Sequence, residues 1–72
     1  MVNVDKLRGK IVECRMTVDD VAKIVGINAA TLYRRLSGGG GAFTIDEADK
    51  IASALSLTPD ELNKIFFAQY VA

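Results

Sequence analysis

The sequence predicts an all-α protein made of five short helices. Apolar residues recur three and four positions apart along most of the chain, which is the spacing that lines one face of a helix. Thr or Asn residues that favour helix starts precede most of these stretches, and no alternating run of strand length is present. The chain has 72 residues, 50% of them apolar and 25% charged, which suits one small core. We therefore expect a single domain over residues 1–72.

The first helix is expected over residues 4–14. Gly9 lies in its middle and weakens its helix propensity by about 1 kcal/mol. Its last residue, Cys14, is predicted to be a small buried residue without chemistry of its own. The predicted inward residues are Val4, Leu7, Ile11 and Cys14.

The second and third helices are expected on either side of Gly26. Thr17 and Asp20 resemble a capping box at the start of a helix that ends at Gly26, where glycine tolerates a left-handed backbone. Asn28 is a favourable N-cap for the third helix, residues 29–36. The predicted inward residues are Val21, Ile24 and Val25 in the second helix and Leu32 and Leu36 in the third.

Two further helices are each expected to begin at a threonine. Thr44 and Glu47 form a full capping box, and Thr58 and Glu61 repeat it with Pro59 at the first helical position. These helices are expected over residues 44–55 and 58–70. The predicted inward residues of the fourth helix are Ile45, Ala48, Ile51, Ala52 and Leu55. Those of the fifth are Leu62, Ile65 and Phe66, to which Tyr70 would be added if the stripe extends to the helix end.

Charge and composition exclude several classes of function. One cysteine and no histidine leave no internal disulfide, no zinc cluster and no histidine base, so we expect no enzyme, metal or cofactor. No apolar run approaches the roughly 18 residues of a membrane span, and charges occupy the start, so we expect a cytoplasmic protein. The net charge is zero, but residues 21–43 carry three basic and no acidic residues, whereas residues 44–72 carry two basic and five acidic ones. The middle of the chain is therefore its basic part.

The segment TVDDVAKIVGINAATLYRRLSG, residues 17–38, resembles the helix-turn-helix of the lambda-repressor-like family, the Cro/cI-type (XRE) regulators of phages and bacteria. A small residue where the helices cross and a glycine at the turn are what this motif requires. The preceding helix and the two that follow extend the resemblance over nearly the whole chain. The residues that carry the match are Ala22, Gly26, Ile27, Leu32, Ser37 and Gly38.

The resemblance implies that the third helix enters the major groove of double-stranded DNA. Alanine at positions 29 and 30 offers bases only a methyl group, so hydrogen-bond reading falls mainly on Arg34, whose fork suits a guanine edge. Arg35 is expected to contact phosphate, although a solvated face would explain one of the two arginines equally well. Tyr33 either reads bases or packs against the second helix. The implied DNA-contacting residues are Thr17, Asn28, Ala29, Ala30, Thr31, Tyr33, Arg34, Arg35, Gly38 and Gly39.

The glycine run in SGGGGAF, residues 37–43, raises the possibility of a nucleotide site. A phosphate-binding loop needs a preceding strand and a following lysine, and this run follows a helix and lacks the lysine. We expect a connector whose exposed N–H groups make weak phosphate contacts. Ala42 and Phe43 are predicted to return the chain to the core.

The last residues, KIFFAQYVA, are strongly apolar. Phe66 is expected to fill the core, whereas Phe67, Tyr70 and Val71 are predicted to form a homodimer contact, because helix-turn-helix proteins commonly pair on two half-sites. The sequence as a whole predicts a DNA-binding transcriptional regulator, a repressor of phage or prophage type, with no small-molecule substrate. The alternative is a protein-interaction module that has lost DNA binding. The zero net charge, the alanines at positions 29 and 30, and Val18 in place of the family's frequent glutamine would permit it.

Overall fold

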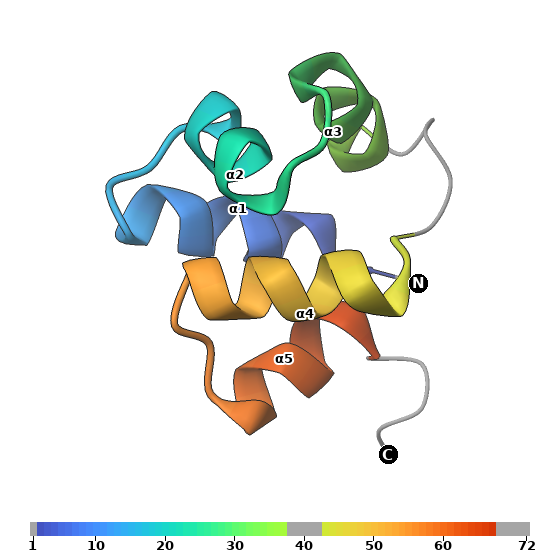
Figure 1. The fold of residues 1–72 in the computed structure, drawn as a ribbon. Coiled ribbons are helices and arrows are strands. Elements are labelled where there is room, and N and C mark those ends of the chain that lie inside the picture. Colours follow the sequence, from blue (N-terminus) through green and yellow to red (C-terminus); the bar gives the residue numbers. More distant parts are fainter. Residues whose placement is uncertain (1, 38–42, 68–72) are drawn as a thin grey trace.

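The computed structural model describes residues 2–37 and 43–67, and within these ranges it is all-α, as predicted (Figure 1). None of the described helices is long and apolar enough to cross a membrane. The helices are α1 (Val4–Glu13), α2 (Val18–Val25), α3 (Ala29–Leu36), α4 (Ile45–Ala54) and α5 (Pro59–Phe66).

The helices enclose one core. In Figure 1, α2 and α3 lie on one side of α1 and α4, and α5 lies on the other side. α2 packs against both α3 and α4, while α1 packs against α5. Every helix contributes side chains to a single cluster of buried apolar residues, and none of the described polar or charged residues is fully buried. The cluster consists of Leu7, Ile11, Val21, Ala22, Val25, Leu32, Leu36, Ala48, Ile51, Leu55, Ile65 and Phe66.

The helix starts confirm the predicted caps. Thr17, Thr44 and Thr58 each accept a hydrogen bond from the backbone N–H three residues later, and the acidic side chain at that position accepts one from the N–H of the threonine. Each threonine cap contributes about 1 kcal/mol. Asn3, which the sequence analysis did not single out, caps α1 by accepting from Lys6 N at 3.1 Å.

α1, α2 and α4 are each followed by a residue with a left-handed backbone, although only α2 has a glycine at that position. Gly26, Arg15 and Ser56 have left-handed backbones, with φ values of 82°, 58° and 53°. For a residue with a Cβ this conformation costs roughly 1–2 kcal/mol. The hydrogen bonds that close the three ends are Met16 N to Ile11 O, Ile27 N to Ala22 O and Leu57 N to Ala52 O, at 2.9–3.1 Å.

Two residues predicted to face inward are exposed. Ile24 is 55% exposed, because the buried face of α2 is formed by Val21, Ala22 and Val25 and Ile24 lies roughly 100° around the helix from its centre. Ile45 is 80% exposed, because it occupies the first turn of α4, ahead of the buried Ala48. The inward predictions for these two isoleucines are therefore wrong.

Two helix ends also differ from the prediction. α1 ends at Glu13, and Cys14 is its C-cap, partly buried, with its Sγ 3.5 Å from Leu55 O. α5 ends at Phe66, and Phe67 is its C-cap. The prediction that this helix continues through Phe67 is therefore wrong. Phe66 is buried and Phe67 packs against the core partly buried, whereas Tyr70 and Val71 lie outside the described residues.

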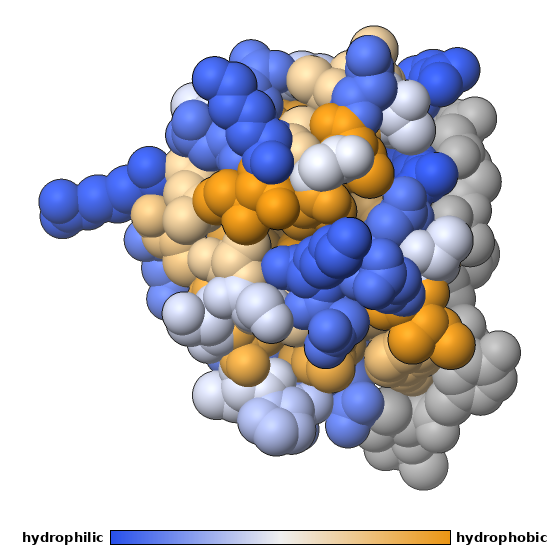
Figure 2. Space-filling view, viewed as in Figure 1, coloured by the Kyte–Doolittle hydropathy of each residue, from blue (hydrophilic) through white to orange (hydrophobic). Residues whose placement is uncertain are grey.

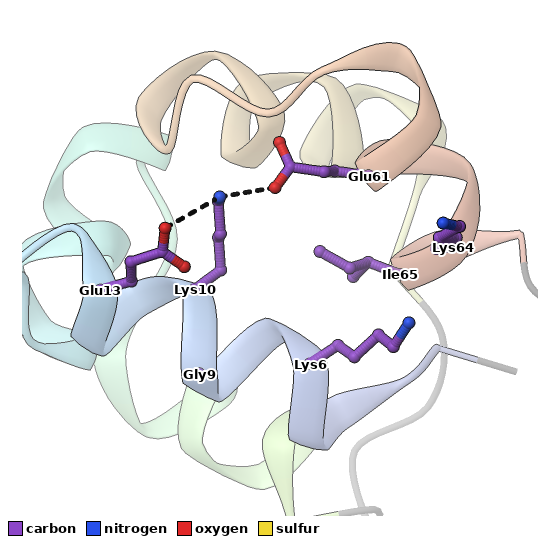
Figure 3. Close-up of a pocket in the computed structure, with 7 residues that line it drawn as sticks. All are labelled: Lys6, Gly9, Lys10, Glu13, Glu61, Lys64 and Ile65. Atoms are coloured by element: carbon purple, nitrogen blue, oxygen red, sulfur yellow. Dashed lines mark hydrogen bonds and ion pairs between the residues drawn. The ribbon is translucent and has the colours of Figure 1, made fainter.

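An ion pair joins α1 to α5. Lys10 Nζ lies 2.5 Å from Glu61 Oε2 and 3.4 Å from Glu13 Oε1, and Figure 3 shows it between the two carboxylates at the edge of a groove. Lys10 and Glu61 lie 51 positions apart, so no local pattern in the sequence indicates this pair. The hydrogen bond from Lys10, followed by the one from the Thr58 backbone, lowers the pKa of Glu61 from 4.5 to about 2.

This lowered pKa predicts a dependence of stability on pH. Because the folded-state pKa of Glu61 lies below its unfolded value, the pair stabilises the protein above pH 4.5, and this stabilisation is lost as the pH falls towards 2. We expect Glu61→Gln, which can still complete the capping box, to be less stable than wild type at pH 7. Urea titrations should show the difference shrinking as the pH falls from 5 to about 2.

Asp60→Asn is the control, because Asp60 pairs with Lys64 on the exposed surface of the same helix. We expect a smaller stability difference for this variant at pH 7, since an exposed pair within one helix contributes about 0.3–0.5 kcal/mol. A difference between wild type and Glu61→Gln that stayed constant from pH 7 to 2.5 would contradict the assignment.

Candidate nucleic-acid interface

α2 and α3 form a pair of helices joined by a tight turn. Gly26, with φ of 82°, ends α2, and its N–H donates to Ala22 O at 2.8 Å. Ile27 follows, partly buried against the core, and Asn28 begins α3. The buried Ala22 allows the two helices to approach closely, and Leu32 anchors α3 in the core. The predicted turn and its core residues are confirmed.

The outward side of α3 carries a continuous exposed stripe. Positions 30, 33, 34 and 37 are exposed, and they are spaced by three, four and seven residues, so they share one face of the helix. We call this face the outer stripe; its residues are Ala30, Tyr33, Arg34 and Ser37.

The outer stripe combines a small residue with longer polar ones. Tyr33 is 46% exposed, so its ring and hydroxyl are accessible to a partner. Arg34 reaches back along the helix, with Nη2 3.4 Å from Thr31 Oγ1, and it retains most of its donors. The small methyl group of Ala30 would let a partner approach the backbone of α3 closely. Arg34 supplies a long hydrogen-bond donor beside it.

The polar N-caps of α2 and α3 have hydrogen-bond donors left over. Asn28 Oδ1 accepts from Ala30 N at 2.8 Å, which occupies the carbonyl oxygen and leaves the side-chain NH₂ group as a donor. Thr17 Oγ1 accepts from Asp20 N at 3.1 Å, and its own O–H remains a donor. Both caps are exposed, so each could donate to a phosphate oxygen.

The electrostatic character differs between the two helix starts. α3 contains two arginines and no acidic residue. α2 begins with Asp19 and Asp20, and the hydrogen bonds from the Thr17 backbone and side chain lower the pKa of Asp20, so it stays ionised at neutral pH. Figure 2 shows hydrophilic side chains along the edge formed by α2 and α3. Attraction for an anionic partner is therefore concentrated on α3.

Several predicted site residues lie away from the outer stripe. Ala29 is partly buried and packs against the core, and Arg35 turns inward to pair with Glu47. Thr31 is partly buried beside Arg34. Gly38 and Gly39 lie outside the described residues.

Sequence reasoning missed two residues near this surface. Ser37 was treated only as part of the helix end, although its spacing of seven from Ala30 places it on the outer stripe. Glu47 was predicted only as a capping residue, yet it also pairs with Arg35, twelve positions earlier. No periodic signal in a sequence connects positions that far apart across a glycine-rich connection.

α2 and α3 are joined by a tight turn at the left-handed Gly26, and α3 exposes the outer stripe. This arrangement defines a helix-turn-helix protein. The comparison with protein families agrees: the model of the Cro/C1-type HTH DNA-binding domain matches residues 6–67. The chain belongs to this family, which confirms the resemblance drawn from its sequence. No curated protein and no solved structure matches the chain.

Proposed function

We propose that this protein is a sequence-specific transcriptional regulator, a repressor of phage or prophage type, that occupies operator DNA in the cytoplasm as a single domain. The observation that carries the proposal is the outer stripe of α3. It presents a methyl group, a phenol, a guanidinium and a hydroxyl on a helix without acidic residues. A major groove presents acceptors and thymine methyl groups that such side chains recognise.

We expect Arg34 and Tyr33 to meet base edges and Asn28 to meet phosphate. Ala30 is the alanine that would contact a thymine methyl, since Ala29 packs against the core. Thr17 would make at most a weak phosphate contact, because the ionised Asp20 lies beside it. A phosphate contact by the glycine loop, residues 38 and 39, remains a prediction from the sequence.

The salt dependence of binding tests the proposed function. A duplex selected by the protein from a random-sequence library should bind less tightly as salt rises from about 50 to 200 mM, with a log–log slope of roughly −0.9 per phosphate contacted. The same titration on a scrambled duplex of equal length is the control. Failure to enrich any sequence from the library would contradict the proposal.

A second candidate function is a protein-interaction module. Three observations favour this function: the apolar side chains of Ile24 and Ile45 are exposed, the net charge is zero, and α2 begins with acidic residues. Such a module would bind a protein partner with little sensitivity to salt and would bind no duplex. The salt titration therefore separates the two candidates.

We also propose that two copies assemble on DNA through the C-terminal residues Phe67, Tyr70 and Val71. This segment is strongly apolar. Helix-turn-helix proteins also commonly bind two DNA half-sites as dimers. Analytical ultracentrifugation should give two copies per selected duplex, and Tyr70→Ser should weaken this pairing. A complex of one copy on a site without repeated halves would show the proposal to be wrong.

A further inference from the structure

Arg35 connects the end of α3 to the start of α4. Its Nη1 donates to Glu47 Oε1, and its guanidinium carbon lies 5.5 Å from the centre of the Phe43 ring. The Arg35 and Glu47 side chains are 17% and 15% exposed, so water and salt screen this ion pair less than the surface pairs of α4 and α5. Arg35 therefore has two partners within the fold.

Both partners of Arg35 are themselves held in place. Glu47 Oε1 also accepts from Thr44 N at 2.9 Å as part of the capping box of α4. The Phe43 ring meets Phe66 of α5 edge to face, with ring centres 5.7 Å apart and an angle of 89° between the planes. A charge held by a fixed carboxylate and a fixed ring has a defined position. Arg35 thus ties α3 to α4 and, through Phe43, to α5.

The two neighbouring arginines face different ways. Arg34 is exposed on the outer stripe, whereas Arg35 follows it by about 100° around the helix and lies against α4. α3 packs chiefly on α2. Among the ion pairs of the described residues, the one between Arg35 and Glu47 is the pair that links α3 to another helix.

We infer that Arg35 is a positioning residue, whose ion pair with Glu47 fixes the orientation of α3 and so the direction in which the outer stripe meets DNA. This inference rests on the proposed function. It replaces the phosphate contact predicted for Arg35 from the sequence. The two roles make opposite predictions for Glu47, because removing a carboxylate near DNA should strengthen binding unless that carboxylate holds the interface in place.

The test compares Glu47→Gln with Asp46→Asn. Both variants remove one negative charge from the first turn of α4, but Asp46 pairs with Lys50 on the exposed surface. Glutamine can still complete the capping box, so the helix start is preserved. Affinity for the duplex selected by the wild-type protein is measured for both, together with the thermal midpoint of each free variant.

We expect Glu47→Gln to weaken binding on the order of tenfold, as disruption of a coupled pair does, while Asp46→Asn leaves binding unchanged or tighter. Arg35→Met should weaken binding similarly and leave the salt slope unchanged. The double variant should lose no more than either single one. A fall in the slope of roughly 0.9 in Arg35→Met, with unchanged or tighter binding by Glu47→Gln, would instead assign Arg35 to phosphate and overturn the inference.

A measurement on the free protein keeps the inference separate from the proposed function. Backbone amide shifts and hydrogen exchange should change along α3 in Glu47→Gln and Arg35→Met but not in Asp46→Asn. If α3 is unaffected in both pair variants, the inference is wrong whatever the DNA result. If the wild-type protein binds no duplex, the proposed function fails, and this measurement still decides whether Arg35 orients α3.

Discussion

Leu32→Ala is expected to lower the free energy of unfolding by about 2–5 kcal/mol, which is the usual cost of removing a leucine from a packed core. Leu32 is fully buried, at 0% exposure, and anchors α3 in the core. A chain of 72 residues has little stability to spare, since the core of a domain this small rarely supplies more than about 3–5 kcal/mol. Urea titration followed by far-UV circular dichroism measures the change directly.

Ile24→Ala is the matched comparison for Leu32→Ala. It shortens a branched aliphatic side chain on the neighbouring helix, but Ile24 is 55% exposed. We expect this variant to stay within about 0.5 kcal/mol of wild type, as surface substitutions usually do. Equal losses in the two variants would mean that α3 is not anchored through Leu32 as the structure has it.

Arg34→Ala is expected to reduce affinity for the selected duplex by about 1–3 kcal/mol, or roughly 5- to 150-fold, and to relax the preference at one base pair. The reason is that Arg34 is the long donor on the outer stripe, where Ala30 offers only a methyl group. Binding titrations on the selected duplex and a second round of site selection with the variant give the two measurements.

Lys64→Ala is the control for loss of one positive charge. Lys64 pairs with Asp60 on α5, which lies on the other side of α1 and α4 from α3 (Figure 1). We expect it to preserve the sequence preference of the wild-type protein. If Arg34→Ala also preserved that preference, specificity would have to come from Tyr33 or from the shape of the duplex.

The helix starts could be predicted because their signals are local. A threonine and an acidic residue three positions later contain the whole capping box, and Gly26 marks its own left-handed turn. The left-handed backbones of Arg15 and Ser56 could not be predicted, because neither residue type favours a positive φ. Local signals therefore defined where helices begin better than where they end.

Burial within a helix was less predictable at its edges. An apolar residue adjacent to the inward stripe can face either the core or the solvent. Ile24 and Ile45 are both exposed to solvent. The outer stripe could be read from the spacing of its residues once Leu32 and Leu36 were placed inside. The inward turn of Arg35 could not, because it depends on where Glu47 lies after the chain has crossed residues 38–42.

The three closed capping boxes of α2, α4 and α5 also bear on how the chain folds. Each fixes a helix start through hydrogen bonds between residues three apart, so the costly first turn is supported before distant segments meet. Proteins dominated by such local contacts cross a low entropic barrier and typically fold in microseconds to milliseconds. We therefore expect the docking of the helices onto one another to limit the folding rate, with few long-range contacts to form.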